Sequence, residues 1–146
     1  MSTGISQRDN TRNQSTLDIT QGHIFMGDNG YQEAVFLNNT GADLALQPAS
    51  LVLRNAADAS QVIPAIAGAT LVDVIGVVAL ENELDVLDGA TANINYCTTG
   101  RIDETRISLP AGVTLDTVVG TKTVRDILNA IGLELVATID NTKHDN

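Results

Sequence analysis

The sequence predicts a mostly β domain with one short helix near its C-terminus and a polar N-terminal arm. Three observations lead to this prediction. Short apolar runs alternate with turn residues from Leu17 onward, one segment near the C-terminus has the spacing of an amphipathic helix, and the first 16 residues hold few large apolar side chains. With 146 residues the chain has the length of one ordinary domain.

Residues 1–16 are rich in Ser, Thr, Asn and Gln, and Met1 and Ile5 are their only large apolar side chains. Such a segment cannot bury enough surface to offset the entropy lost on ordering. We therefore expect a disordered arm over residues 1–16, a single β-rich domain over 17–140 and a polar tail over 141–146. A frayed terminus without a role is the simpler alternative for the arm.

The β-rich domain is predicted from short apolar runs that are separated by turn residues. The apolar runs are His23–Met26, Ala34–Leu37, Ser50–Leu53, Val62–Ile66 and Val72–Leu80. The predicted breaks are Gly27–Gly30, Asn38–Gly41, Pro48, Asp88–Gly89 and Thr98–Gly100. The Ala-rich segment Ala65–Thr70 fits either a helical turn or an extended chain.

One helix is predicted over Thr123–Ile131, where Val124, Ile127, Leu128 and Ile131 fall on one face. Thr123 is suited to cap the N-terminus, and Gly132 stands where a left-handed residue ends a helix. A half-buried strand follows, because Leu133, Leu135, Ala137 and Ile139 alternate with more polar neighbours.

Composition excludes several classes of partner. Eight basic against 18 acidic residues give a net charge of −10, which disfavours nucleic acid and anionic membranes. The arm holds Arg8, Arg12 and Asp9, so the acidic charge belongs to the body. No apolar stretch is long enough for a signal peptide or a membrane span. Cys97 is the only cysteine, which excludes an internal disulfide and fits a small core residue.

No catalytic, cofactor or metal site is predicted. The two histidines, His23 and His144, lie far apart in the sequence, so a catalytic triad or a closed zinc site is not expected. The best chemical candidate is the acidic cluster Glu81–Asp88. On a strand, Glu81, Glu83 and Asp85 would share one face about 7 Å apart, as a loose cation site or a pair of catalytic carboxylates requires. A solvated strand face that discourages edge pairing is the simpler interpretation.

From about Leu44 to Val136 the order of features resembles the phage lambda-type head decoration (capsid-stabilising) family. The segments that carry the resemblance are Leu51–Leu53, Gly76–Ala79, Ala92–Thr98 with the turn Gly100–Ile102, Leu109–Gly112, and the helix and strand of Arg125–Val136. No single segment is diagnostic, and the resemblance lies in their order and spacing. The sequence differs from the family in having fewer aromatic residues, no Trp and a longer N-terminal half.

The resemblance implies a β-tulip fold and a structural role without enzymatic activity. It implies a homotrimer that binds the major capsid protein on the outer surface of the expanded head of a bacteriophage, after synthesis in the host cytoplasm. It also implies an arm that becomes ordered by adding a strand to the coat protein. We expect that strand around Ser15, Thr16, Leu17, Asp18, Ile19 and Thr20. Two alternatives stay open, namely a cation- or carbohydrate-binding or enzyme domain that uses Glu81–Asp88, and a tail or fibre module.

Overall fold

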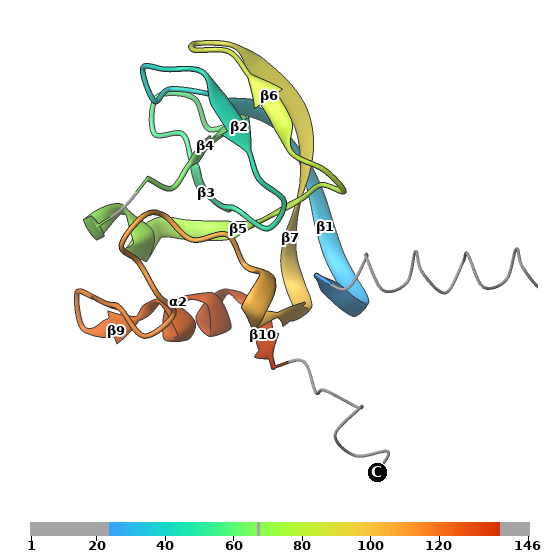
Figure 1. Cartoon of the computed structure of the whole chain (residues 1–146), viewed down its shortest axis with the longest axis vertical. Coiled ribbons are helices and arrows are strands. Elements are labelled where there is room, and N and C mark those ends of the chain that lie inside the picture. Colours follow the sequence, from blue (N-terminus) through green and yellow to red (C-terminus); the bar gives the residue numbers. More distant parts are fainter. Residues whose placement is uncertain (1–23, 67, 138–146) are drawn as a thin grey trace, which may run out of the picture.

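The computed structural model describes residues 24–66 and 68–137 (Figure 1). They form a mostly β structure with a single α-helix near its C-terminal end, which confirms the predicted fold class. The strands are β1 (Phe25–Leu37), β2 (Leu44–Leu46), β3 (Leu51–Arg54), β4 (Gln61–Pro64), β5 (Val74–Ala79), β6 (Leu84–Val86), β7 (Thr91–Asp103), β8 (Val118–Val119), β9 (Lys122–Thr123) and β10 (Leu133–Val136). The helices are α2 (Val124–Ile131) and the 3₁₀ turns η1 (Gly68–Asp73) and η2 (Glu104–Arg106).

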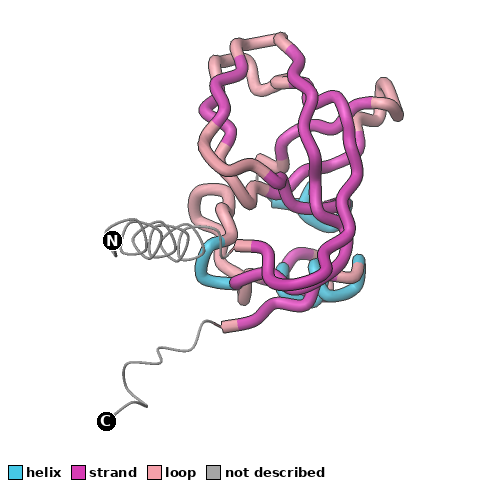
Figure 2. The backbone as a smooth tube through the Cα atoms, turned by 90° about the vertical axis from the view of Figure 1, so that its right-hand side faces the viewer, coloured by secondary structure: helices cyan, strands magenta, loops and turns pink. Residues whose placement is uncertain are grey.

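Five strands close into a barrel. Hydrogen bonding follows the order β1-β4-β3-β5-β7, and β7 pairs again with β1. The two longest strands, β1 and β7, run antiparallel and side by side through the height of the molecule (Figures 1 and 2). Beyond the reach of β5, the end of β7 pairs with β10 in parallel. Closure leaves the barrel strands with short unpaired edges, which limits uncontrolled strand pairing.

The barrel wall separates two apolar cores. The inner core takes side chains from all five barrel strands and is closed at one end by the small β2–β6 sheet. Its buried members are Ala34, Phe36, Leu46, Val52, Val62, Val78, Val86, Ile94 and Tyr96. The outer core lies against β3, β5 and β7 and is covered by η1 and α2. Because both faces of β3 are buried, Leu51–Leu53 reads as a continuous apolar run.

The helix follows its prediction closely. The Thr123 hydroxyl accepts a hydrogen bond from the backbone N–H of Asp126 at 3.2 Å. At the other end Gly132 has a φ of 115°, and its N–H donates to the Asn129 carbonyl. Val124, Ile127 and Leu128 are buried in the outer core. The apolar face of α2 therefore fixes the helix against the barrel wall.

Two predicted breaks are wrong, because Gly27–Gly30 and Thr98–Gly100 lie inside β1 and β7. The pairing of these strands shifts register between Met26 and Tyr31, so the first segment is a bulge. Gly27 and Gly100 adopt positive φ of 92° and 116° there. The Asn29 amide fills the bulge and donates to the Arg101 carbonyl at 3.0 Å.

The other predicted turns are confirmed at Asn38–Gly41, Pro48 and Asp88–Gly89, where β1, β2 and β6 end. The predicted strand Val72–Leu80 is shorter than expected, because Val72 and Asp73 belong to η1 and β5 begins at Val74. The end of the segment Ala65–Thr70, from Gly68 onward, also lies in η1. The C-terminal strand is confirmed as far as Val136, while Ala137 is exposed and Ile139 lies outside the described residues. In the described ranges we find no helix with the length and apolar character to cross a bilayer.

Candidate assembly surface

The chain enters and leaves the described body at the same end. The first residue of β1, Phe25, pairs with Ile102, and the last residue of β10, Val136, pairs with Asp103. The two strands thus flank the end of β7, about 10 Å apart by strand spacing. Figure 1 shows this end at the bottom and the β2–β6 sheet at the top. The segments before residue 24 and after residue 137 are therefore attached to one end of the barrel.

Asp103 holds this end together. Its side chain is 1% exposed, and its Oδ1 accepts hydrogen bonds from the N–H of Thr105 at 3.0 Å and from the Thr105 hydroxyl at 2.7 Å. Its Oδ2 lies 3.3 Å from the guanidinium of Arg106, and its own N–H donates to the Ile24 carbonyl. A buried carboxylate with this many partners is strongly fixed. The point at which β1 begins is therefore rigidly placed.

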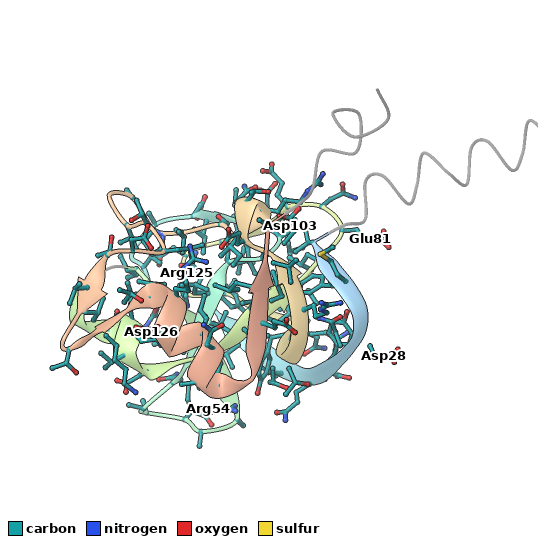
Figure 3. All side chains as sticks on the ribbon, turned by 90° about the horizontal axis from the view of Figure 1, so that it is seen from below. Asp28, Arg54, Glu81, Asp103, Arg125 and Asp126 are labelled. Carbon is teal, nitrogen blue, oxygen red and sulfur yellow. The ribbon has the colours of Figure 1, made fainter. Side chains whose placement is uncertain are left out.

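An apolar hollow lies beside the start of β1. It has a volume of about 360 Å³, and its lining includes Phe25, Tyr31, Leu80 and Glu81. The two aromatic rings pack edge to face with centroids 5.8 Å apart, yet Tyr31 remains 49% exposed. Figure 3 shows Glu81 and Asp103 on either side of the start of β1. Exposed aromatic side chains on a rigid support are typical of contact surfaces.

The predicted capsid-binding residues Ser15, Thr16, Leu17, Asp18, Ile19 and Thr20 lie outside the described residues, as do His23 and His144. The hollow at Phe25 and Tyr31 was missed by the sequence analysis. Its only signal was two of the four aromatic residues close together in the sequence. The pairing of β1 with β7 brings Asn95 to them, and the pairing of β5 with β7 brings Leu80, which follows β5.

The prediction that Glu81, Glu83 and Asp85 share one strand face is wrong. Only Asp85 lies on a strand, because β6 pairs with the three-residue β2 and its ladder ends at Leu84. Glu83 lies in the preceding loop and accepts a hydrogen bond from the Gln47 amide at 2.8 Å. Within residues 24–66 and 68–137, no three His, Cys, Asp or Glu side chains are grouped so as to hold a metal ion.

Cys97 is a buried core residue, as its sequence context predicts. Its Sγ accepts a hydrogen bond from the Asn29 amide at 3.4 Å and donates to the Thr99 carbonyl at 3.1 Å. Burial raises the pKa of the Cys97 thiol, and these hydrogen bonds offset the effect only in part. The thiolate is the nucleophilic form, so the folded protein disfavours thiol chemistry at this position.

Cys97 is expected to react slowly with a chromogenic disulfide in the folded protein and rapidly in urea. The unfolded thiol ionises near its ordinary pKa of 9.0, before the folded one does. Burial of the neutral Cys97 thiol therefore contributes its full stabilisation below pH 9.0, and this stabilisation is lost as the pH rises through the pKa of the folded thiol. Urea unfolding of the native chain and of Cys97→Ala, at pH values below and above 9.0, measures how the free energy of unfolding changes with the ionisation of the thiol. Equal labelling rates with and without urea would contradict the burial of the thiol.

Comparison with protein-family models finds no matching family, and comparison with curated proteins finds no match.

Proposed function

We propose that the chain is a structural head decoration protein of a bacteriophage, which binds the outer surface of the expanded capsid as a trimer and stabilises it. The observation that carries the proposal is the attachment of the N-terminal segment beside a rigid, aromatic, partly exposed hollow at one end of a closed barrel. This end combines an anchored contact surface with the point at which the polar N-terminal segment joins the body.

The barrel supports a structural role. Its inner core draws on all five strands, and its outer core is sealed by α2, so the body is rigid enough to bridge neighbouring subunits. The segments on which the resemblance rests fall on regular elements, since Leu51–Leu53, Gly76–Ala79 and Ala92–Thr98 lie in β3, β5 and β7 and Arg125–Val136 lies in α2 and β10. The resemblance to the decoration family implies that this arrangement is a β-tulip.

The arm gives the proposed binding step its mechanism. Leu17 and Ile19 alternate with polar residues, so an added strand would turn both side chains to one face. The described body begins at Ile24, a few residues later, with Phe25 in the hollow. Strand addition and burial of the hollow would thus occur at one contact with the coat protein.

Stabilisation of the head follows from mass action. A ligand that binds the expanded lattice and not the precursor lattice shifts the equilibrium toward expansion in proportion to its differential affinity. Many copies on one shell multiply this effect. No bond needs to be made or broken, so the proposal requires no catalytic group and no cofactor.

Deletion of residues 2–16 is expected to leave a folded trimer that no longer decorates expanded capsids. In the full chain, Leu17→Ser with Ile19→Ser is expected to weaken capsid binding at least about 100-fold, because two apolar side chains lose their burial. Asn39→Ser, at an exposed position outside the expected strand, is the control and should bind normally. Co-sedimentation with capsids measures all three. Saturation of capsids by the truncated chain with unchanged affinity would disprove the role of the arm.

The position of the protein on the virion separates decoration from a tail or fibre module. Antibody-labelled particles viewed in negative stain are expected to carry the label over the head surface. Label confined to the tail or fibres would contradict the proposed function while leaving the fold unaffected.

A further inference from the structure

A second apolar groove lies away from the surface at the start of β1. It is formed between η1, the β8–β9 turn and α2, has a volume of about 420 Å³, and is lined by Val72, Val119, Ile127 and Ile131 among others. At its side Val72 is 49% exposed, and the neighbouring Val118 is 64% exposed. Several apolar side chains thus adjoin one opening, which distinguishes this place from a scattered surface valine.

A lone cation stands at this groove. Lys122 lines it, and among the Lys and Arg residues in the described part of the chain, only Lys122 has a side chain with neither an ion pair nor a hydrogen bond. Arg101, Arg106 and Arg125 pair with carboxylates, and Arg54 bonds to Tyr96. On a chain with a net charge of −10, an unpaired ammonium group beside an apolar groove favours an acidic, apolar partner.

The chain itself presents an apolar side chain between carboxylates, at the end of the barrel opposite to the groove. Leu87 is 64% exposed at the turn after β6, between the exposed carboxylates Asp85 and Asp88. Between Arg54 and Arg101 the sequence holds six acidic and no basic residues. An apolar side chain flanked by carboxylates matches the groove in both polarity and charge.

The turn that carries Leu87 is rigid. The Leu87 carbonyl accepts a hydrogen bond from the Ala90 N–H at 2.9 Å, and the Asp88 N–H donates to the Asp43 carboxylate at 2.9 Å. Beneath it the fully buried Asn38 amide donates to the Val86 carbonyl at 2.9 Å. Leu87 is therefore presented in a fixed position, so docking costs little conformational entropy.

We propose that the Leu87 turn of one copy docks in the α2–β9 groove of a second copy, with Asp88 facing Lys122. Figure 1 places β6 at the top of the barrel and α2 with β9 at the bottom, so one chain cannot fill its own groove with this turn. A contact between two different patches is head-to-tail, and it forms a ring when the rotation between successive copies closes and an open filament when it does not. The proposed trimer requires the closed form. The inference rests on the proposed function only for the number of copies, three.

The arm of a second copy fits the groove less well. Its first 16 residues carry two Arg and one Asp, so their net charge repels Lys122. The acidic Leu87 turn attracts it. Residues 17–20 carry one carboxylate, Asp18, against the two of the Leu87 turn, Asp85 and Asp88. Charge therefore disfavours residues 1–16 and favours the Leu87 turn over residues 17–20.

Sedimentation of the full chain across a concentration series tests the contact. Leu87→Ser, Lys122→Glu and Asp88→Lys are each expected to weaken self-association at least about ten-fold. Combining Lys122→Glu with Asp88→Lys restores the opposite charges and should recover most of the affinity. Asp28→Lys, an exposed position in the β1 bulge with the same change in charge, is the matched control and should associate normally. Thermal melting verifies that each variant is folded.

The outcomes separate this inference from the proposed function. A wild-type chain that is monomeric at every concentration, or a trimer that survives all three single substitutions, would overturn the Leu87–Lys122 contact. Capsid decoration by the wild-type chain, whether it is a monomer or a trimer in solution, would still support the proposed function. If Leu17→Ser with Ile19→Ser disrupts the trimer and the Leu87 variants do not, the arm occupies the groove and the inference is wrong.

Discussion

Gly76→Ala is expected to lower the free energy of unfolding by about 3 kcal/mol. A Cβ at position 76 would lie 2.6 Å from the Cys97 carbonyl oxygen and 2.6 Å from Cδ2 of Tyr96. The carbonyl belongs to β7, which pairs with β5 at Val77, and the ring belongs to the inner core. The carbonyl cannot move without disturbing the pairing of β5 with β7, and the ring cannot move without disturbing the inner core.

Gly30→Ala is the matched control for this variant. Its Cβ would meet the Thr99 hydroxyl at 2.5 Å, an equally short contact, but that hydroxyl is the end of a side chain that can rotate. We expect a cost below about 1 kcal/mol. Urea unfolding of both variants measures the difference. Equal stabilities would contradict the close packing of β5 on β7.

Asn38→Ala is expected to lower the free energy of unfolding by a similar amount, about 3 kcal/mol. The side chain is fully buried, and its amide donates to the carbonyls of Ala42 at 2.7 Å and Val86 at 2.9 Å. Its oxygen accepts from the N–H of Thr40 at 3.1 Å and from the Thr40 hydroxyl at 2.7 Å. Alanine would leave both carbonyls without this donor and open a void.

Asn39→Ala tests whether burial causes this effect. Asn39 has the same side chain one position later and is exposed, so its replacement should change stability by less than about 0.5 kcal/mol. Because Asn38 also supports the Leu87 turn, Asn38→Ala should weaken self-association as well. A loss below about 1 kcal/mol for Asn38→Ala would show that the loop it joins is not part of the cooperative fold.

The elements that local sequence determines were predicted well. The helix α2 has its cap at Thr123, its apolar face at Val124, Ile127 and Leu128, and its left-handed end at Gly132, all within one short segment. The apolar run of β3 was equally clear. Each of these signals depends on neighbours a few residues away, so no knowledge of the tertiary structure is required.

The breaks at Gly27–Gly30 and Thr98–Gly100 were predicted wrongly for a physical reason. Glycine with positive φ serves both a hairpin turn and a strand bulge, and the local sequence does not distinguish them. The deciding contact is the Asn29 amide on the Arg101 carbonyl, between residues 72 positions apart. The same long-range pairing creates the hollow at Phe25 and Tyr31.

The acidic cluster failed as a prediction because strand length depends on a partner. Alternation of Glu81, Glu83 and Asp85 suits a strand, but β2 offers only three residues for pairing, so the ladder is too short to place them on one face. The arm on which the proposed binding depends lies outside the described residues, so its role stays a prediction.

Binding of the full chain to expanded and unexpanded bacteriophage capsids tests the central claim, the proposed decoration of the head, most directly. Co-sedimentation at equal protein concentration measures the number of copies retained by each form. Preferential binding predicts saturation of expanded capsids, little retention on precursor capsids, and a higher melting temperature of the decorated shell. Equal retention on both forms, or no binding to either, would contradict the proposed role in head stabilisation.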